Sequence, residues 1–131
     1  MTFTRLPSLI AILFLVGCAS GSSSGGSLFQ SKAEKNLAVG IHQYDEGNYV
    51  EAVANLQDAL TQGLDKQDEV RARKYLAFTH CVSGKQKACA DEFRKALAID
   101  PALELAPSEA GHPIWGPVFK SVKAKAGAAK K

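Results

Sequence analysis

The sequence predicts an all-α protein, and two observations support this prediction. The first is a pattern of small and apolar residues that occurs twice between residues 33 and 101, at an offset of 37 residues. The second is the spacing of apolar residues by three and four positions within each copy, which is typical of amphipathic helices. We therefore expect an α-solenoid of two helical hairpins, closed by a C-terminal capping helix.

Six positions of the first copy recur in the second as an identical residue or one of similar character. The pairs are Gly40 and Ala77, Gly47 and Gly84, Ala52 and Cys89, Leu56 and Phe93, Ala59 and Ala96, and Leu60 and Leu97. Gly47 and Gly84 mark a tight turn between two helices in each copy. The small residues predict close crossings of antiparallel helices, where a larger side chain would push the pair apart.

This pattern resembles the tetratricopeptide repeat, a helical hairpin with a period of about 34 residues. The resemblance covers roughly half of the chain and places the repeats at about residues 33–64 and 70–101. It implies a scaffold that binds another protein, with the first helix of each repeat on the concave face. On this chain those partner-binding positions are Leu37, Ile41, Tyr44, Arg71, Lys74 and Phe78. Apolar residues with a basic rim would suit an extended or helical peptide that bears acidic groups.

Helix boundaries are indicated by local signals. Ser31 followed by Glu34 is typical of a capping box at the start of the first helix. Gly63 adopts positive φ freely and suits the end of the second helix. The third helix is expected at 70–82, and the fourth at 86–99, where Pro101 prevents its continuation.

A capping helix is expected over residues 110–124. Solenoid repeats bury their faces against neighbours, and two repeats leave one flank of the second uncovered. Trp115, Phe119 and Val122 recur at helical spacing, and Pro117 suits a first turn that starts near Gly116. Trp115 has two interpretations, as a residue of this cap or as an aromatic contact for a partner.

The N-terminus has the features of a targeting signal. Arg5 precedes an apolar run at 9–16, which is shorter than the ~20 residues that span a bilayer and has the length of a signal-peptide core. The sequence Leu15-Val16-Gly17-Cys18 resembles the lipobox of bacterial lipoproteins. The resemblance implies that residues 1–17 are a signal peptide and that the Cys18 thiol carries a covalent lipid, with no other cofactor. The alternative is an ordinary secretory signal with an incidental cysteine.

The residue after the lipobox and the next segment predict where the domain is held. Ala19 stands where an aspartate would imply retention in the inner membrane, so the resemblance implies the outer membrane of a diderm host. Residues 18–30 are rich in Ser and Gly and are expected to form a flexible tether. This tether would hold the domain in the periplasm, close to the lipid headgroups.

Charge is divided unevenly along the chain. Residues 32–109 carry ten basic and thirteen acidic side chains, whereas the residues after Glu109 carry five lysines and no acid. A net charge of +3 is too mild to indicate nucleic-acid binding. The lysines are Lys120, Lys123, Lys125, Lys130 and Lys131, and residues 125–131 are expected to be a basic flexible tail. The tail either contacts peptidoglycan or anionic lipid or is a solvated terminus without a role.

Cys81 and Cys89 form an even pair in a compartment that favours disulfides. They lie on opposite arms of one predicted hairpin, where their Cα atoms could approach the distance that a disulfide needs. The alternatives are two small buried residues or a zinc site with His80. Adjacent helical residues diverge by about 100°, which argues against His80 and Cys81 sharing a metal.

The sequence indicates a binding protein and not an enzyme. No nucleophile with a base, no phosphate loop and no paired carboxylate in an apolar setting stands out. Small lipoproteins of this plan resemble assembly components of secretion and pilus machines. The segments 93–101 and 111–119 resemble the C-terminal end of proteobacterial lipoproteins associated with type VI secretion. We therefore expect an envelope adaptor with a protein partner, or a structural envelope lipoprotein, and self-association is a further option.

Overall fold

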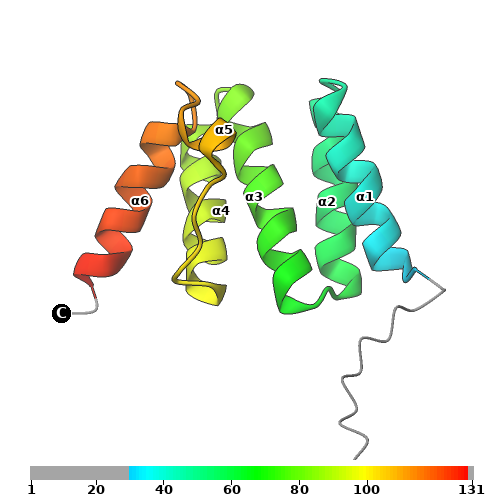
Figure 1. Ribbon diagram of the computed structural model, residues 1–131. Coiled ribbons are helices and arrows are strands. Elements are labelled where there is room, and N and C mark those ends of the chain that lie inside the picture. The colour runs from blue at the N-terminus through cyan, green and yellow to red at the C-terminus, as the bar shows by residue number, and fades with distance from the viewer. Residues whose placement is uncertain (1–29, 130–131) are drawn as a thin grey trace, which may run out of the picture.

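The computed structural model describes residues 30–129, and this range contains six α-helices and no strand. The helices are α1 (Lys32–Asp45), α2 (Tyr49–Gln62), α3 (Lys66–Val82), α4 (Gln86–Ile99), α5 (Pro107–Ala110) and α6 (Gly116–Ala128). This composition confirms the predicted all-α class. Figure 1 shows the long helices side by side in a row, with α1 and α2 at one end and α6 at the other.

The predicted signal peptide at 1–17, Cys18 with its lipid, and all of the tether except Gln30 lie outside the described residues. Lys130 and Lys131 of the predicted tail also lie outside them. Within residues 30–129, no helix combines the length and the apolar character needed to cross a bilayer.

Side-chain caps fix the starts of α1 and α3. The Ser31 hydroxyl accepts from the Glu34 amide at 3.1 Å, and a Glu34 carboxylate oxygen accepts from the Ser31 amide at 2.8 Å, which is the predicted capping box. The Asp65 carboxylate accepts from the Asp68 amide at 2.8 Å. Because Asp65 is a strong N-cap, α3 starts at Lys66, earlier than the predicted start at residue 70.

The α1–α2 and α3–α4 turns repeat one another in their backbone hydrogen bonds. Gly47 and Gly84 have φ angles of +80° and +74°, which favour glycine. Four amide-to-carbonyl bonds recur at an offset of 37 residues: Glu46 to His42 and Ser83 to Thr79, Gly47 to Tyr44 and Gly84 to Cys81, Asn48 to Gln43 and Lys85 to His80, and Ala52 to Asn48 and Cys89 to Lys85. The internal sequence repeat is therefore also a repeat of backbone conformation.

The core has two parts that meet at α3. The first contains aliphatic residues of α1, α2 and α3, namely Leu37, Leu56, Ala59, Ala72 and Leu76. The second is rich in aromatic residues and joins α3, α4 and α6, with Phe78, Phe93, Trp115, Phe119 and Val122 among its members. The α6 side chains Phe119 and Val122 are buried in this second part, so α6 covers the C-terminal flank of α4.

The C-terminal helix differs from its predicted bounds. It begins at Gly116 as expected, but it continues to Ala128, beyond the predicted end at 124. The first half of the predicted flexible tail is therefore helical as far as Ala128. Alanine has the highest intrinsic helix propensity, and three alanines between 124 and 128 favour this extension. Pro107–Ala110 forms a separate short helix in the segment that leads to α6.

Candidate protein-binding face

The resemblance to tetratricopeptide repeats predicts that a partner binds to the face formed by the first helix of each repeat. In the structure these helices are α1 and α3, and we call this surface the α1–α3 face. Two of the side chains predicted to bind there are buried, since Leu37 and Phe78 are each 2% exposed. Trp115, the residue of the predicted cap for which a partner contact was the alternative, is 7% exposed. A partner cannot reach these side chains without displacing the core. Their assignment as partner-binding residues is therefore corrected, and for Trp115 the structure favours the core interpretation.

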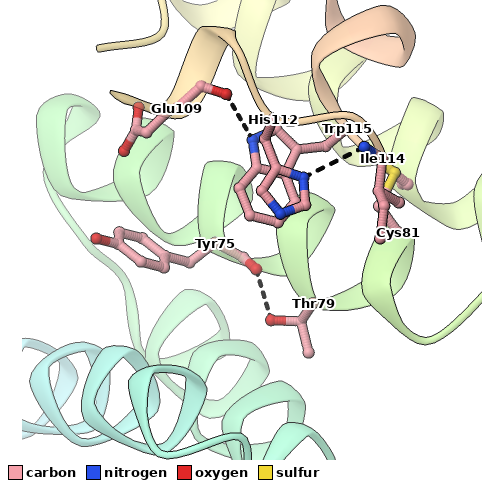
Figure 2. Close-up of a disulfide and its surroundings, with 8 residues drawn as sticks. Tyr75, Thr79, Cys81, Glu109, His112, Ile114 and Trp115 are labelled. Carbon is pink, nitrogen blue, oxygen red and sulfur yellow. Dashed lines mark hydrogen bonds between the residues drawn. A yellow bond between two sulfur atoms is a disulfide. The ribbon is translucent and has the colours of Figure 1, made fainter. Parts of the chain in front are cut away.

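Trp115 is held in the core by the segment before α6. Its ring stacks on Phe78 with 4.5 Å between centroids, and its indole Nε1 donates a hydrogen bond to the Glu109 carbonyl at 3.0 Å. Figure 2 shows the His112 imidazole lying parallel to the indole, with 3.3 Å between the ring centroids. The segment 107–115 thus covers Phe78, and nothing in the sequence indicated that this segment would return to α3.

Tyr44 is half-buried in the last turn of α1. Its ring lies 5.3 Å from Tyr75, 6.2 Å from Phe78 and 6.5 Å from Trp115, measured between centroids. Burial, with smaller contributions from neighbouring acidic groups, raises the pKa of Tyr44 to about 12. Tyr44 therefore fastens α1 to the aromatic part of the core and leaves only part of its ring for a partner.

Two hollows among the described residues border α3, and one of them also borders α1. The smaller, of about 270 Å³, lies between α1 and α3 and is lined by Gln30, Glu34, Leu37, Ala38, Ile41, Asp68 and Arg71. The larger, of about 510 Å³, runs from α3 to the end of α4 and is lined by Lys66, Gln67, Val70, Arg71, Lys74, Ile99, Asp100 and Leu103. Arg71 borders both hollows. Its exposed side chain therefore stands where one ligand could contact both.

The basic groups of this face differ in how far they are already paired. The Lys74 ammonium lies 2.8 Å from a Glu109 carboxylate oxygen and 5.5 Å from the Tyr75 ring centroid. Among residues 30–129, Arg71 and Lys66 form no ion pair. Arg71 and Lys66 therefore offer positive charge to an anionic group, whereas Lys74 is occupied by Glu109. The sequence missed Glu109 because its pairing depends on the return of the segment after α4.

Cys81 and Cys89 are joined by a disulfide across the α3–α4 hairpin, with 5.2 Å between their Cα atoms. Both residues are buried, and the bond takes both thiols that the alternative zinc site needed. Burial lowers the pKa of the neighbouring His80. Among the described residues, no three His, Cys, Asp or Glu side chains gather in a way that could hold a metal ion.

Comparison of the chain with protein-family models, with curated proteins and with solved structures found no match. Its function must therefore be inferred from the residues and geometry of this chain.

Proposed function

We propose that this protein is a lipid-anchored adaptor of the bacterial outer membrane that binds a partner protein in the periplasm through the α1–α3 face. The lipobox-like sequence ending at Cys18 supports the anchor, and the residue after it supports the outer membrane. The repeated turn, with four backbone hydrogen bonds at one offset, supports a solenoid of tetratricopeptide type. Such repeats present surface and hold a ligand on one face.

The observation that carries this proposal is the position of Arg71 between the two hollows. Ile41 offers a half-buried apolar contact in the smaller hollow, and Lys66 adds a second free positive charge in the larger one. An extended or helical peptide with an apolar anchor and acidic side chains fits this combination. The adaptor would act in an assembly of the cell envelope, with a type VI secretion machine or a pilus as the leading settings.

Photo-crosslinking in intact cells tests the proposal. A photoreactive amino acid at Ile41 of the full-length chain is expected to capture one defined protein. The variant Arg71→Glu should lower that capture by about tenfold or more, because it places a negative charge beside the acidic groups of the partner. Lys87→Glu is the matched control, since Lys87 is exposed on α4 and lines neither hollow. Equal capture in the two variants would overturn the role of Arg71.

The anchor is tested separately. Mass spectrometry of the mature protein should find a lipid-modified N-terminal Cys18 in the outer-membrane fraction. A mature chain with an unmodified Cys18 would contradict the anchor and leave the crosslinking result unaffected.

A further inference from the structure

The α1–α2 hairpin forms one end of the row of helices, is acidic as a whole and has exposed apolar residues. Residues 32–62 carry two lysines against five acidic side chains, a net charge of −3. Val50 is 80% exposed and Val39 is 44% exposed. Monomeric proteins carry single exposed apolar residues routinely, so these valines matter only in combination with the opposite end of the molecule.

The opposite end is formed by α6, and it is basic. This helix carries three lysines and no acidic residue. Lys120 and Lys125 are exposed and form no ion pair within residues 30–129, while Lys123 donates to the Leu103 carbonyl at 2.8 Å and pairs with Glu104. Beside α6 lies a hollow of about 710 Å³. Its lining includes apolar residues, two lysines and the acidic residue that pairs with one of them, namely Leu105, Pro113, Pro117, Phe119, Ala124, Lys120, Lys123 and Glu104.

The two ends are therefore complementary in charge, and each has apolar surface. Figure 1 shows them at opposite ends of the row, with no described element outside α1 and α2 or outside α6. One chain cannot bring these ends together, but two copies can. A contact between different surfaces of two identical chains is heterologous, and it can be repeated from copy to copy.

We propose that copies of this protein associate head to tail, with the α1–α2 hairpin of one copy seated on α6 of the next. Val50 enters the hollow beside α6, and Glu51 lies opposite Lys120. The contact leaves the hollows around Arg71 free, so a row of copies would present several α1–α3 faces. This inference does not depend on the identity of the partner or on the lipid.

Crosslinking between two differently tagged full-length copies tests the arrangement. A photoreactive amino acid at Val50 of one copy should attach to residues 116–128 of the other, as mapped by mass spectrometry. The same probe at Lys87 is the matched control and should not attach there, because Lys87 lies on α4 between the two ends. Attachment of the Val50 probe to α1 or α2 of the second copy, to another protein alone, or to nothing would each overturn the proposal.

A charge exchange sharpens the test. Glu51→Lys alone and Lys120→Glu alone should each lower the Val50 crosslink to the second copy by about two- to fivefold, which is the range expected for one exposed ion pair. The double variant, with both changes in every copy, should regain the original yield because the pair is restored with its charges reversed. Failure of the double variant to recover would overturn the pairing of Glu51 with Lys120.

Two further results separate this inference from the other roles considered. Capture of the partner through Ile41 should be unchanged in Glu51→Lys and in Lys120→Glu, so the adaptor function and self-association can fail independently. If Lys120→Glu abolishes binding to anionic phospholipid vesicles and leaves crosslinking between copies intact, α6 serves a lipid surface and the proposal is overturned.

Discussion

The two helical hairpins share one backbone turn but hold their helices together in different ways. The repeat offset of 37 residues places Tyr44 at the position of Cys81, and Ala52 at the position of Cys89. In the α3–α4 hairpin these positions form a disulfide. In the α1–α2 hairpin the helices are instead packed closely at Gly40, where a β-carbon would lie only 2.7 Å from Cγ of Leu56.

This difference follows the position of each hairpin in the row. The α3–α4 hairpin lies between α2 and α6, and its side chains belong to both parts of the core. Within residues 30–129, the α1–α2 hairpin has neighbouring helices on one side only, and its part of the core consists of aliphatic residues. Regions with fewer buried contacts open at lower free energy, so we expect α1 and α2 to exchange their amide hydrogens before α3 and α4. The Cys81–Cys89 disulfide would then keep the α3–α4 hairpin folded while the α1–α2 hairpin opens.

The largest expected effect is the loss of the aromatic core of the central hairpin. Phe93 is 0% exposed and its ring lies 6.0 Å from Phe78 and 5.1 Å from Phe119, measured between centroids. Phe93→Ala should lower the free energy of unfolding by about 3–5 kcal/mol, because it leaves a cavity between three elements. Urea denaturation followed by circular dichroism measures this change. Lys87→Ala, at an exposed position of α4, is the control and should change stability by less than about 0.5 kcal/mol.

The disulfide should have the next largest effect. It closes a loop with a sequence separation of 8, and the chain-entropy relation for such a loop gives about 2.5 kcal/mol. A reducing agent should lower the free energy of unfolding of the natural protein by about that amount. The double variant Cys81→Ala with Cys89→Ala should not respond to the reducing agent. If the double variant responds equally, the reducing agent acts at another site, and the Cys81–Cys89 disulfide does not stabilise the α3–α4 hairpin.

The sequence predicted the elements that depend on local signals. The capping box at Ser31, the glycine turns and the start of α6 at Gly116 all depend on residues close together in the chain. The burial of Phe78 could not be predicted in the same way. It results from the segment 107–115 crossing back over α3, where Trp115 stacks on Phe78 and Glu109 pairs with Lys74. These contacts join residues far apart in sequence, and no periodic pattern encodes them.

The candidate site was predictable only in part for the same reason. The repeat pattern predicts that the first helices of the two repeats, α1 and α3, contribute to one face, but it does not predict which side chains on that face remain accessible. All three of Leu37, Ile41 and Arg71 line the smaller hollow, but Arg71 is exposed and Ile41 half-buried, whereas Leu37 is only 2% exposed. The sequence does not single out Lys66, because Lys66 precedes the third helix predicted at 70–82, whereas in the structure it is the first residue of α3.

A smaller effect is expected at Gly40, where α1 and α2 approach each other closely. Gly40→Ala should cost about 1–3 kcal/mol through overpacking against Leu56, less the gain in helix propensity of about 1 kcal/mol. In a Leu56→Ala background the same change should cost less, because the Cγ and Cδ2 atoms that it meets are gone. Thermal unfolding of the four proteins of this cycle measures the coupling. Additive effects would show that Gly40 does not hold the helices together through Leu56.

The smallest expected effect concerns Tyr44, which occupies the position that the other hairpin gives to Cys81. Burial raises the pKa of Tyr44 to about 12 from an ordinary value of 10.0, so the folded state holds the phenolic proton more tightly than the unfolded chain. The resulting stabilisation is fully present below pH 10 and is lost as pH rises toward 12. Tyr44→Phe keeps the ring contacts and removes the proton. The free energy of unfolding of this variant should therefore fall less steeply between pH 10 and 12 than that of the natural protein. Equal slopes would mean that Tyr44 is solvated, and α1 would then not be fastened to the aromatic core through this side chain.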